Sequence, residues 1–252
     1  MLFWTSFFVF RRARVIAVTL YWLEASILRG GTVLLLTLTH RQEDSCPKRL
    51  LDQNHKWADD FEREHPGFFK KSAEHQHPKV LWLGCSDSRV PESVITAAFP
   101  GEIFVQRNIG NQCILIDDNF LSVLEYALSE HVGVEHVVIT GHTNCGACQA
   151  ALDAIHTPCP KPIPEPPTSL DRWLIPLINL ARTLPPDEAT VNVLVRKNIW
   201  QQVENMANSN PVQRNWRNGG NVSIHGWIYQ LDNGYLTELF EIRKGDKIGG
   251  EA

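Results

Sequence analysis

The sequence predicts an α/β fold in which a mainly parallel central sheet is flanked by helices. Three short runs, at residues 79–84, 102–106 and 136–140, are predicted to be strands, and the run 79–84 has the continuous apolar composition of a strand buried on both faces. Helical patterns alternate with these runs, as expected for right-handed crossovers between parallel strands. The segment 221–242 predicts two further strands joined at Asp232-Asn233-Gly234, which form a C-terminal hairpin.

The helices are predicted from the spacing of apolar residues and from the residues that begin and end helices. From about Leu51, apolar side chains recur near helical spacing until Pro66-Gly67 stops the pattern. Residues 117–131 begin with capping residues and continue as an amphipathic helix. Further helices are predicted to begin at Gly146 and to cover residues 189–207.

Two segments depart from this regular pattern. Residues 157–169 contain six prolines and are predicted to form a stiff loop inside the domain, because helical patterns resume on both sides. Residues 1–45 form an N-terminal extension, and a single domain is predicted to cover residues 46–252. The first forty residues are apolar and carry four arginines against one acid. Their apolar runs are too short for a membrane-spanning helix.

The composition of the extension leaves its role open. Excess arginine and scarce acids fit a mitochondrial transit peptide, so the predicted location is cytoplasmic or mitochondrial. A poorly folded extension and a mis-called start of the gene are the alternatives.

The overall composition is that of a soluble globular protein. The chain has 252 residues, of which 43% are hydrophobic and 21% charged, and this length suffices for one large domain. The net charge of -4 includes no basic surplus, so nucleic acid is not a predicted partner. The six cysteines lack the dense spacing of a disulfide scaffold, which favours metal ligation or burial.

Cysteine and histidine follow two predicted strands at the same edge of the sheet. Cys85 lies one residue past the run 79–84, and His142 lies two residues past the run 136–140. In open parallel sheets, ligands bind just beyond the carboxyl ends of the strands. Cys145 follows His142 by three residues, a spacing at which a turn can aim both side chains at one point. Two thiolates and one imidazole form a good zinc set, with a fourth position left open as in catalytic sites.

An acidic and a basic residue accompany this predicted metal site. If the chain stays extended after Cys85, alternation brings Cys85, Asp87 and Arg89 onto one face. Asp87 could then occupy the fourth position on the metal, and Arg89 could compete for its carboxylate. Paired with Arg89, the carboxylate leaves that position to water, and released from Arg89 it closes the site. The sequence therefore contains a plausible switch.

Each of these residues also has a simpler explanation when taken alone. A lone cysteine at a strand end is commonly a small buried hydrophobe, and Cys145-x-x-Cys148 could be a redox pair. Their joint position at one sheet edge favours the metal site. Cys148 is predicted to be buried on a helix, and His225 and Trp227 to be ordinary residues of a strand.

Four motifs carry a resemblance to a known family. The stretches "CSDSR", "PGEIFVQRNIGN", "GHTNCGAC" and "IHGWIYQLDNGYL" resemble those of the β-class carbonic anhydrases, in the same order, over roughly residues 50–242. The resemblance implies the β-carbonic anhydrase fold and a lyase that hydrates carbon dioxide reversibly to bicarbonate and a proton. It implies one zinc per subunit, because Cys85, His142 and Cys145 match the zinc ligands. By the same match, Asp87 and Arg89 are the catalytic dyad.

The resemblance also implies residues that surround the substrate. Gln76 matches a glutamine that hydrogen-bonds bicarbonate in the plant-like branch of the family. Phe104, Ile109 and Tyr126 match positions that line a small pocket for carbon dioxide or bicarbonate. In the family this pocket is completed across a dimer interface, which implies a homodimer or a higher homo-oligomer.

Two other functions remain open on sequence grounds. One keeps the fold and the zinc but hydrolyses carbon disulfide, a reaction known on the same scaffold. The other is a non-catalytic zinc-binding regulatory subunit. That function predicts the loss of Asp87, Arg89 or Gln76, and all three are present.

Overall fold

The computed structural model describes residues 46–156 and 168–248. The N-terminal extension, most of the proline-rich loop and Cys159 lie outside the described residues. The chain divides into two units, Met1–Pro66 and Gly67–Ala252. The described part of the first unit contains helix α2 (Cys46–Glu64), none of whose residues is buried. The boundary between the units falls inside the predicted single domain of residues 46–252.

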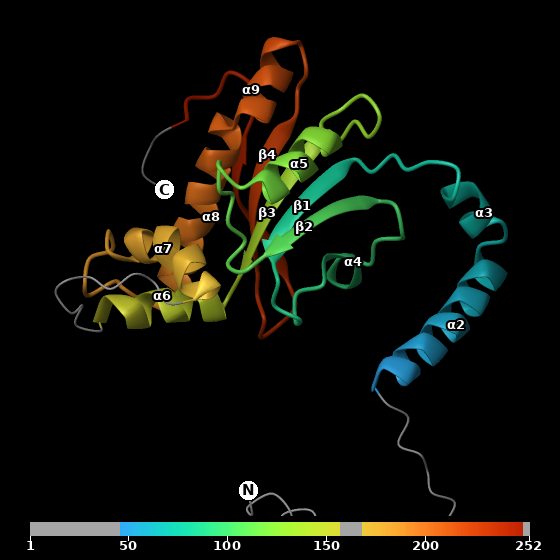
Figure 1. Ribbon diagram of the computed structural model, residues 1–252, viewed down its shortest axis with the longest axis horizontal. Helices are drawn as coiled ribbons and strands as arrows, with labels where there is room; N and C mark the ends of the chain where they lie inside the picture. Colours follow the sequence, from blue (N-terminus) through green and yellow to red (C-terminus); the bar gives the residue numbers. More distant parts are fainter. Residues whose placement is uncertain (1–45, 157–167, 249–252) are drawn as a thin grey trace, which may run out of the picture. The chain divides into compact units, whose positions relative to one another are not determined.

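The second unit is built on one five-stranded sheet (Figure 1). Its strands lie in the order β2-β1-β3-β4-β5. All neighbours are parallel except β4 and β5, which pair antiparallel. The predicted mainly parallel sheet with a C-terminal hairpin is therefore confirmed. The strands are β1 (Val80–Cys85), β2 (Ile103–Asn108), β3 (His136–His142), β4 (Ser223–Tyr229) and β5 (Leu236–Ile242).

Helices connect the strands, and local sequence signals mark where several of them begin. Asp117 caps α5 by accepting a hydrogen bond from the backbone N–H of Asn119 at 3.0 Å. Thr168 and Asp171 form a capping box at the start of α7. Within the described ranges, no helix is long and apolar enough to cross a membrane. The helices of this unit are α3 (Phe68–Ser72), α4 (Glu92–Ile95), α5 (Asp118–Ala127), α6 (Gly146–His156), α7 (Ser169–Ala181), α8 (Val191–Asn208) and α9 (Asn210–Arg217).

The main hydrophobic core lies on one face of the sheet. Alternate residues along a strand point to the same face, so every second residue of β1, β3 and β4 enters this core. Buried side chains of α5 and α8 belong to the same cluster. The strand residues in it include Leu81, Leu83, Val137, Ile139, Ile224 and Ile228. Removing this much apolar surface from water is the principal stabilising contribution to the fold.

Glycines in β3 and β4 allow α8 to lie directly on the sheet. A Cβ atom placed on Gly141 would come within 2.8 Å of the Ile199 side chain, and one on Gly226 within 2.9 Å of the same residue. Both distances are below normal contact, so a larger residue at either position would push the helix away. Gly141 lies within β3, which continues to His142 and is therefore longer than the predicted run 136–140.

Candidate metal centre

Three buried ligand atoms meet at the carboxyl ends of β1 and β3. The two Sγ atoms of Cys85 and Cys145 and a ring nitrogen of His142 all lie within 4.8 Å of one another. The exposed fractions of these residues are 5%, 1% and 0%, respectively. The sequence prediction placed Cys85 and His142 just beyond their strands, which is wrong in detail. Each is the last residue of its strand, with Cys145 immediately before α6.

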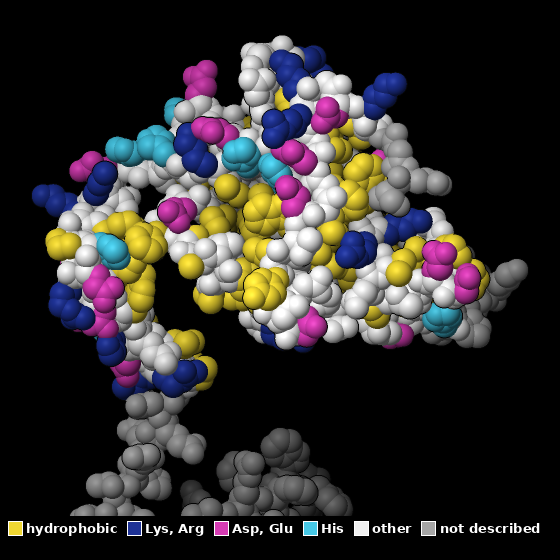
Figure 2. Space-filling model, turned by 180° about the vertical axis from the view of Figure 1, so that it is seen from behind, with side chains coloured by type: hydrophobic (Ala, Val, Ile, Leu, Met, Phe, Trp, Pro, Cys, Tyr) yellow, Lys and Arg dark blue, Asp and Glu magenta, His cyan; other side chains and the backbone are white. Residues whose placement is uncertain are grey.

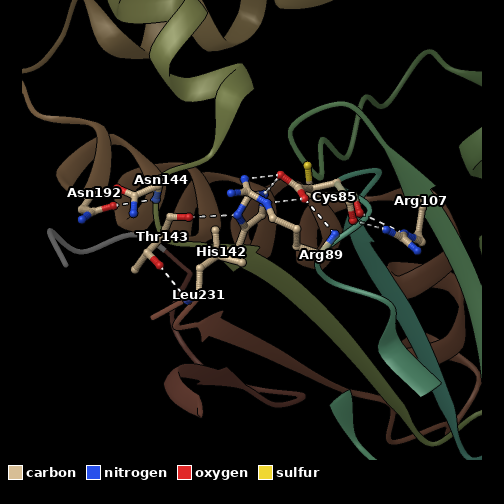
Figure 3. A network of polar contacts seen from close by, with 9 residues as sticks. Cys85, Arg89, Arg107, His142, Thr143, Asn144, Asn192 and Leu231 are labelled. Atoms are coloured by element: carbon tan, nitrogen blue, oxygen red, sulfur yellow. Dashed lines mark hydrogen bonds and ion pairs between the residues drawn. The ribbon is translucent and has the colours of Figure 1, made fainter. Parts of the chain in front are cut away.

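Backbone contacts hold the segment that carries His142 and Cys145. The N–H of Thr143 donates to the carbonyl of Tyr229 at 3.0 Å, and the Thr143 hydroxyl accepts from the N–H of Leu231 at 2.9 Å. The Asn192 side chain accepts from the N–H of Asn144, whose φ of 53° lies in the left-handed region. Figure 3 shows the contacts of Thr143 with Leu231 and of Asn144 with Asn192 on one side of His142. The end of β4 and the start of α8 therefore fix this segment.

The orientation of the His142 ring suits a metal ligand. Its Nδ1 lies 3.0 Å from the carbonyl oxygen of Thr143. Because a carbonyl only accepts, Nδ1 must carry the hydrogen, which leaves a lone pair on Nε2 of the neutral ring. Nε2 is buried and makes no hydrogen bond with any described residue. A buried ring nitrogen in this state, with the other nitrogen bound to a carbonyl, is typical of metal-ligating histidines.

The two thiols are poorly suited to ionise without a cation beside them. The neighbouring Cys145 thiol, followed by burial, raises the pKa of Cys85 to about 12, although His142 opposes this effect. The contact with Cys148, followed by burial, raises the pKa of Cys145 to about 11, although Cys85 opposes this effect. A bound cation reverses such shifts, because thiolates are the form that metals bind. The donor set therefore fits a divalent metal that accepts sulfur and nitrogen ligands.

Asp87 and Arg89 form the pair that the sequence suggested, but in a different backbone conformation. The N–H of Val90 donates to the carbonyl of Asp87 at 3.1 Å, so the chain makes a turn instead of staying extended. This turn brings the Arg89 guanidinium back onto the carboxylate, where Nε and Nη2 donate to the two oxygens at 2.9 and 2.7 Å. The backbone N–H of Arg89 adds a third bond at 2.9 Å.

The carboxylate of Asp87 lies at the edge of the cysteine–histidine cluster. One of its oxygens is 3.8 Å from Nε2 of His142, too far for a hydrogen bond. The Arg89 guanidinium holds the pKa of Asp87 far below its usual range, so the carboxylate is ionised at neutral pH. An ionised carboxylate is thus held beside the cluster by an arginine that occupies both of its oxygens.

Arg107, which the sequence reasoning did not single out, also contacts this turn. From β2 it donates through Nε to the carbonyl of Cys85 at 2.9 Å and through Nη2 to the carbonyl of Asp87 at 2.6 Å. In Figure 3, Arg107 approaches from one side of Cys85 and Arg89 from the other. Arg107 directly follows the predicted run 102–106, and this place at the carboxyl end of a parallel strand is the sequence signal that could have identified it.

The residues expected to surround the substrate do not all lie at this edge of the sheet. Ile109 directly follows β2, whose last residue pairs with Cys85. Phe104 pairs with Leu81, four residues before Cys85, which corresponds to roughly 13 Å along the strand. The Tyr126 ring is 5.9 Å from the Phe104 ring. Gln76 is exposed and precedes β1, at the end of the strand opposite to Cys85.

Replacing Cys148 tests which cysteines belong to the cluster. Cys148 is buried on α6, as predicted, and contacts Cys145. We expect Cys148→Ala to keep the metal and most activity, with stability lowered by about 1 kcal/mol because a small buried side chain is truncated. Metal analysis, activity and thermal unfolding of the variant measure these effects. Loss of the metal from this variant would show that Cys148 is a ligand.

Comparisons with known proteins agree with this geometry. The family model described as carbonic anhydrase matches residues 80–236, which include the whole cluster. A carbonic anhydrase from Emericella nidulans is 34% identical over 198 residues, which cover 76% of this chain and 82% of that protein.

Two solved structures are similar in fold as well as in sequence. The Coccomyxa β-carbonic anhydrase in complex with acetazolamide has a TM-score of 0.68 and 34% identity, over 79% of this chain and 88% of that one. A tetrameric β-carbonic anhydrase from Sordaria macrospora has a TM-score of 0.66 and 30% identity, over 77% and 97% of the two chains. With the five-stranded sheet and the cysteine–histidine cluster, these matches show that the chain belongs to the β-class carbonic anhydrases.

Proposed function

We propose that this protein catalyses the reversible hydration of carbon dioxide to bicarbonate and a proton, with one zinc ion per subunit held by Cys85, His142 and Cys145. Two thiols and one imidazole are ligands that zinc prefers, and three protein ligands leave a fourth position open. Zinc in such a site supplies a water of lowered pKa, which is the nucleophile that this reaction needs. Carbonic anhydrases with three histidine ligands are the standard example of that effect.

The observation that carries the proposal is the ionised carboxylate held beside the open position. Both oxygens of Asp87 are bound by Arg89, and one of them is 3.8 Å from Nε2 of His142. A purely structural zinc site is closed by a fourth protein ligand and has no use for such a pair. This arrangement therefore favours catalysis over the regulatory-subunit function.

The proposed roles of the other residues follow from their chemistry. Asp87 accepts a hydrogen bond from the nucleophilic water and orients it, while Arg89 keeps the carboxylate away from the metal. Gln76 donates its amide hydrogen to the oxygen that gains negative charge as bicarbonate forms. Phe104, Ile109 and Tyr126 supply apolar walls, which suit a small uncharged substrate.

Zinc analysis combined with two parallel assays tests the function. We expect about one zinc per subunit, and carbon dioxide hydration by stopped flow that is lost on chelation and restored by zinc. Carbon disulfide hydrolysis is measured on the same sample. Zinc-loaded protein that hydrolyses only carbon disulfide, or that turns over neither substrate, would reject carbon dioxide hydration.

A second subunit would bring the separated pocket residues together. In their own subunit, three of the expected pocket residues lie toward the amino ends of the strands, whereas the cluster lies at the carboxyl ends. These three residues are Gln76, Phe104 and Tyr126. Apolar side chains near the free edge strand β2 are exposed, including Val105 at 37% and Tyr126 at 50%. Figure 2 shows hydrophobic side chains gathered over the middle of one face. Unpaired strand edges and apolar patches favour association, so we propose that each site is completed by a partner copy.

We expect the protein to sediment as a dimer or larger, and Val105→Lys to weaken association because lysine on an edge strand opposes pairing. The activity of Val105→Lys should fall as association weakens, while its zinc content stays at the wild-type level. Ile175→Lys, which changes another exposed apolar residue, is the matched control.

Mixing inactive Gln76→Ala and Asp87→Ala proteins should restore about a quarter of wild-type activity if subunits exchange and share sites. A fully active monomer would contradict the shared site.

A further inference from the structure

We infer that Arg107 is a positioning residue that fixes the Asp87–Arg89 turn relative to the metal ligands and so keeps Asp87 off the metal. This inference rests on the proposed function, because it concerns how the open position stays open.

The turn is tied to β2 at three consecutive points. Arg107 donates to the carbonyls of Cys85 and Asp87, and the N–H of Ser86 donates to the carbonyl of Asn108 at 2.9 Å. The carbonyl of Asp87 also accepts from Val90 within the turn, so both of its lone pairs are used. One guanidinium therefore links a metal ligand and the catalytic carboxylate to a neighbouring strand.

The carboxylate of Glu92 limits the movement of the Arg107 guanidinium from a third side. Its Nη1 lies 3.6 Å from a carboxylate oxygen of Glu92, the first residue of α4. That oxygen is buried and makes no hydrogen bond among the residues described. The Arg107 side chain is itself only 25% exposed. Charge and burial together thus hold the guanidinium against the turn.

Arg89 cannot perform this function, although it binds Asp87 directly. Both residues belong to the same turn, so their pair moves with the turn as a unit. The Arg89 side chain is 58% exposed and contacts the turn itself. The Asp87 carboxylate already lies 3.8 Å from Nε2 of His142. A small rotation of the turn would therefore bring this carboxylate closer to the ligand atoms that would hold the metal, and Arg107 opposes that rotation from outside the turn.

The test compares Arg107→Met and Arg107→Lys with the wild type. Methionine keeps the apolar stem but removes all donors, whereas lysine can reach only one of the two carbonyls. We expect Arg107→Met to retain zinc and to lose roughly 10-fold to 100-fold in kcat at pH 7. Hydroxide competes with the carboxylate for the fourth position on the metal. If the variant makes binding of the carboxylate there ten times more favourable, the midpoint of the pH–rate profile moves up by about one pH unit. The kcat and the pH midpoint of Arg107→Lys should lie between those of the wild type and those of Arg107→Met.

A spectroscopic measurement separates this effect from a general loss of structure. In cobalt-substituted protein, the visible spectrum reports whether carboxylate or water occupies the fourth position. Arg107→Met should show the carboxylate-bound spectrum at pH 7, and the additional Asp87→Ala change should abolish it. Glu92→Gln should shift the pH profile in the same direction by less. Arg214→Gln, which breaks an exposed ion pair with Glu125, is the control and should match the wild type.

The outcomes separate this inference from the proposed function. A uniform loss of rate at every pH with an unchanged cobalt spectrum would reduce Arg107 to a structural residue and overturn the inference. If Arg107→Met does not fold, Arg107→Lys and Glu92→Gln decide the matter by the same two measurements. A wild type inactive toward carbon dioxide would reject the proposed function, but the cobalt spectra would still test Arg107.

Discussion

Cys85→Ser, His142→Ala and Cys145→Ser are each expected to lose zinc and to abolish carbon dioxide hydration. Each variant removes one of only three protein ligands, and the remaining two cannot hold the ion against a chelator. We expect zinc content below about a tenth of the wild-type value after dialysis. Metal analysis and stopped-flow hydration on the same samples check the result.

Cys113 offers a matched control for these variants. It is as buried as Cys145, with 1% exposed, but lies outside the cluster. Cys113→Ala should keep zinc and activity while losing stability from the truncated side chain. A Cys145→Ser protein with full zinc content and full rate would contradict the ligand assignment, whatever the control shows. The comparison separates loss of a ligand from loss of a buried sulfur.

The strands of the fold were predictable because local composition determines them. The runs in β1 and β3 are buried and apolar, the run in the edge strand β2 follows the Pro100-Gly101 turn, and the hairpin is marked by Asp232-Asn233-Gly234. Helix α9 was not predicted, because its eight residues are mostly polar and too few to show a helical period. The end of β3 was also missed, since Gly141 and His142 continue the strand without an apolar signal.

The site was predictable in its residues but less so in its geometry. Cys85 and His142 could be placed at one sheet edge, because parallel strands put their carboxyl ends together. The turn at Asp87 could not be predicted from alternate spacing. Its carbonyl at Asp87 accepts a hydrogen bond from Arg107, which is twenty residues further on and reaches the turn only after β1 and β2 have paired. The position of Gln76 before β1, at the other end of the strand from Cys85, follows directly from the sequence.

Arg89→Ala is expected to retain zinc, to let Asp87 bind it as a fourth ligand, and to lose nearly all hydration activity. Without the guanidinium, an ionised carboxylate lies beside a cation with no competing partner. The loss should exceed about 100-fold in kcat, since the position for the nucleophilic water is blocked. Arg89→Lys keeps the charge but not the planar fork, so it should restore only part of the rate. Zinc analysis, the cobalt spectrum and stopped-flow rates measure these effects.

Asp87→Ala distinguishes a blocked position from a missing carboxylate. This variant should also retain zinc, but with the fourth position open to water or a small anion, while turnover falls because nothing orients the water.

Wild-type activity should rise with pH, and Asp87 is not the group that titrates. Arg89 holds the pKa of Asp87 far below its usual range, and even the ordinary pKa of an aspartate lies well below neutral pH. The carboxylate is therefore ionised near neutral pH in both proteins, and its affinity for the metal is constant there. In the wild type, a higher pH favours hydroxide over water at the position that Arg89 keeps open; in Arg89→Ala, hydroxide must also displace the carboxylate. Arg89→Ala should thus need a higher pH than the wild type to recover any activity. An Arg89→Ala protein with the wild-type rate and pH profile would mean that the Asp87–Arg89 pair serves only the structure of the turn.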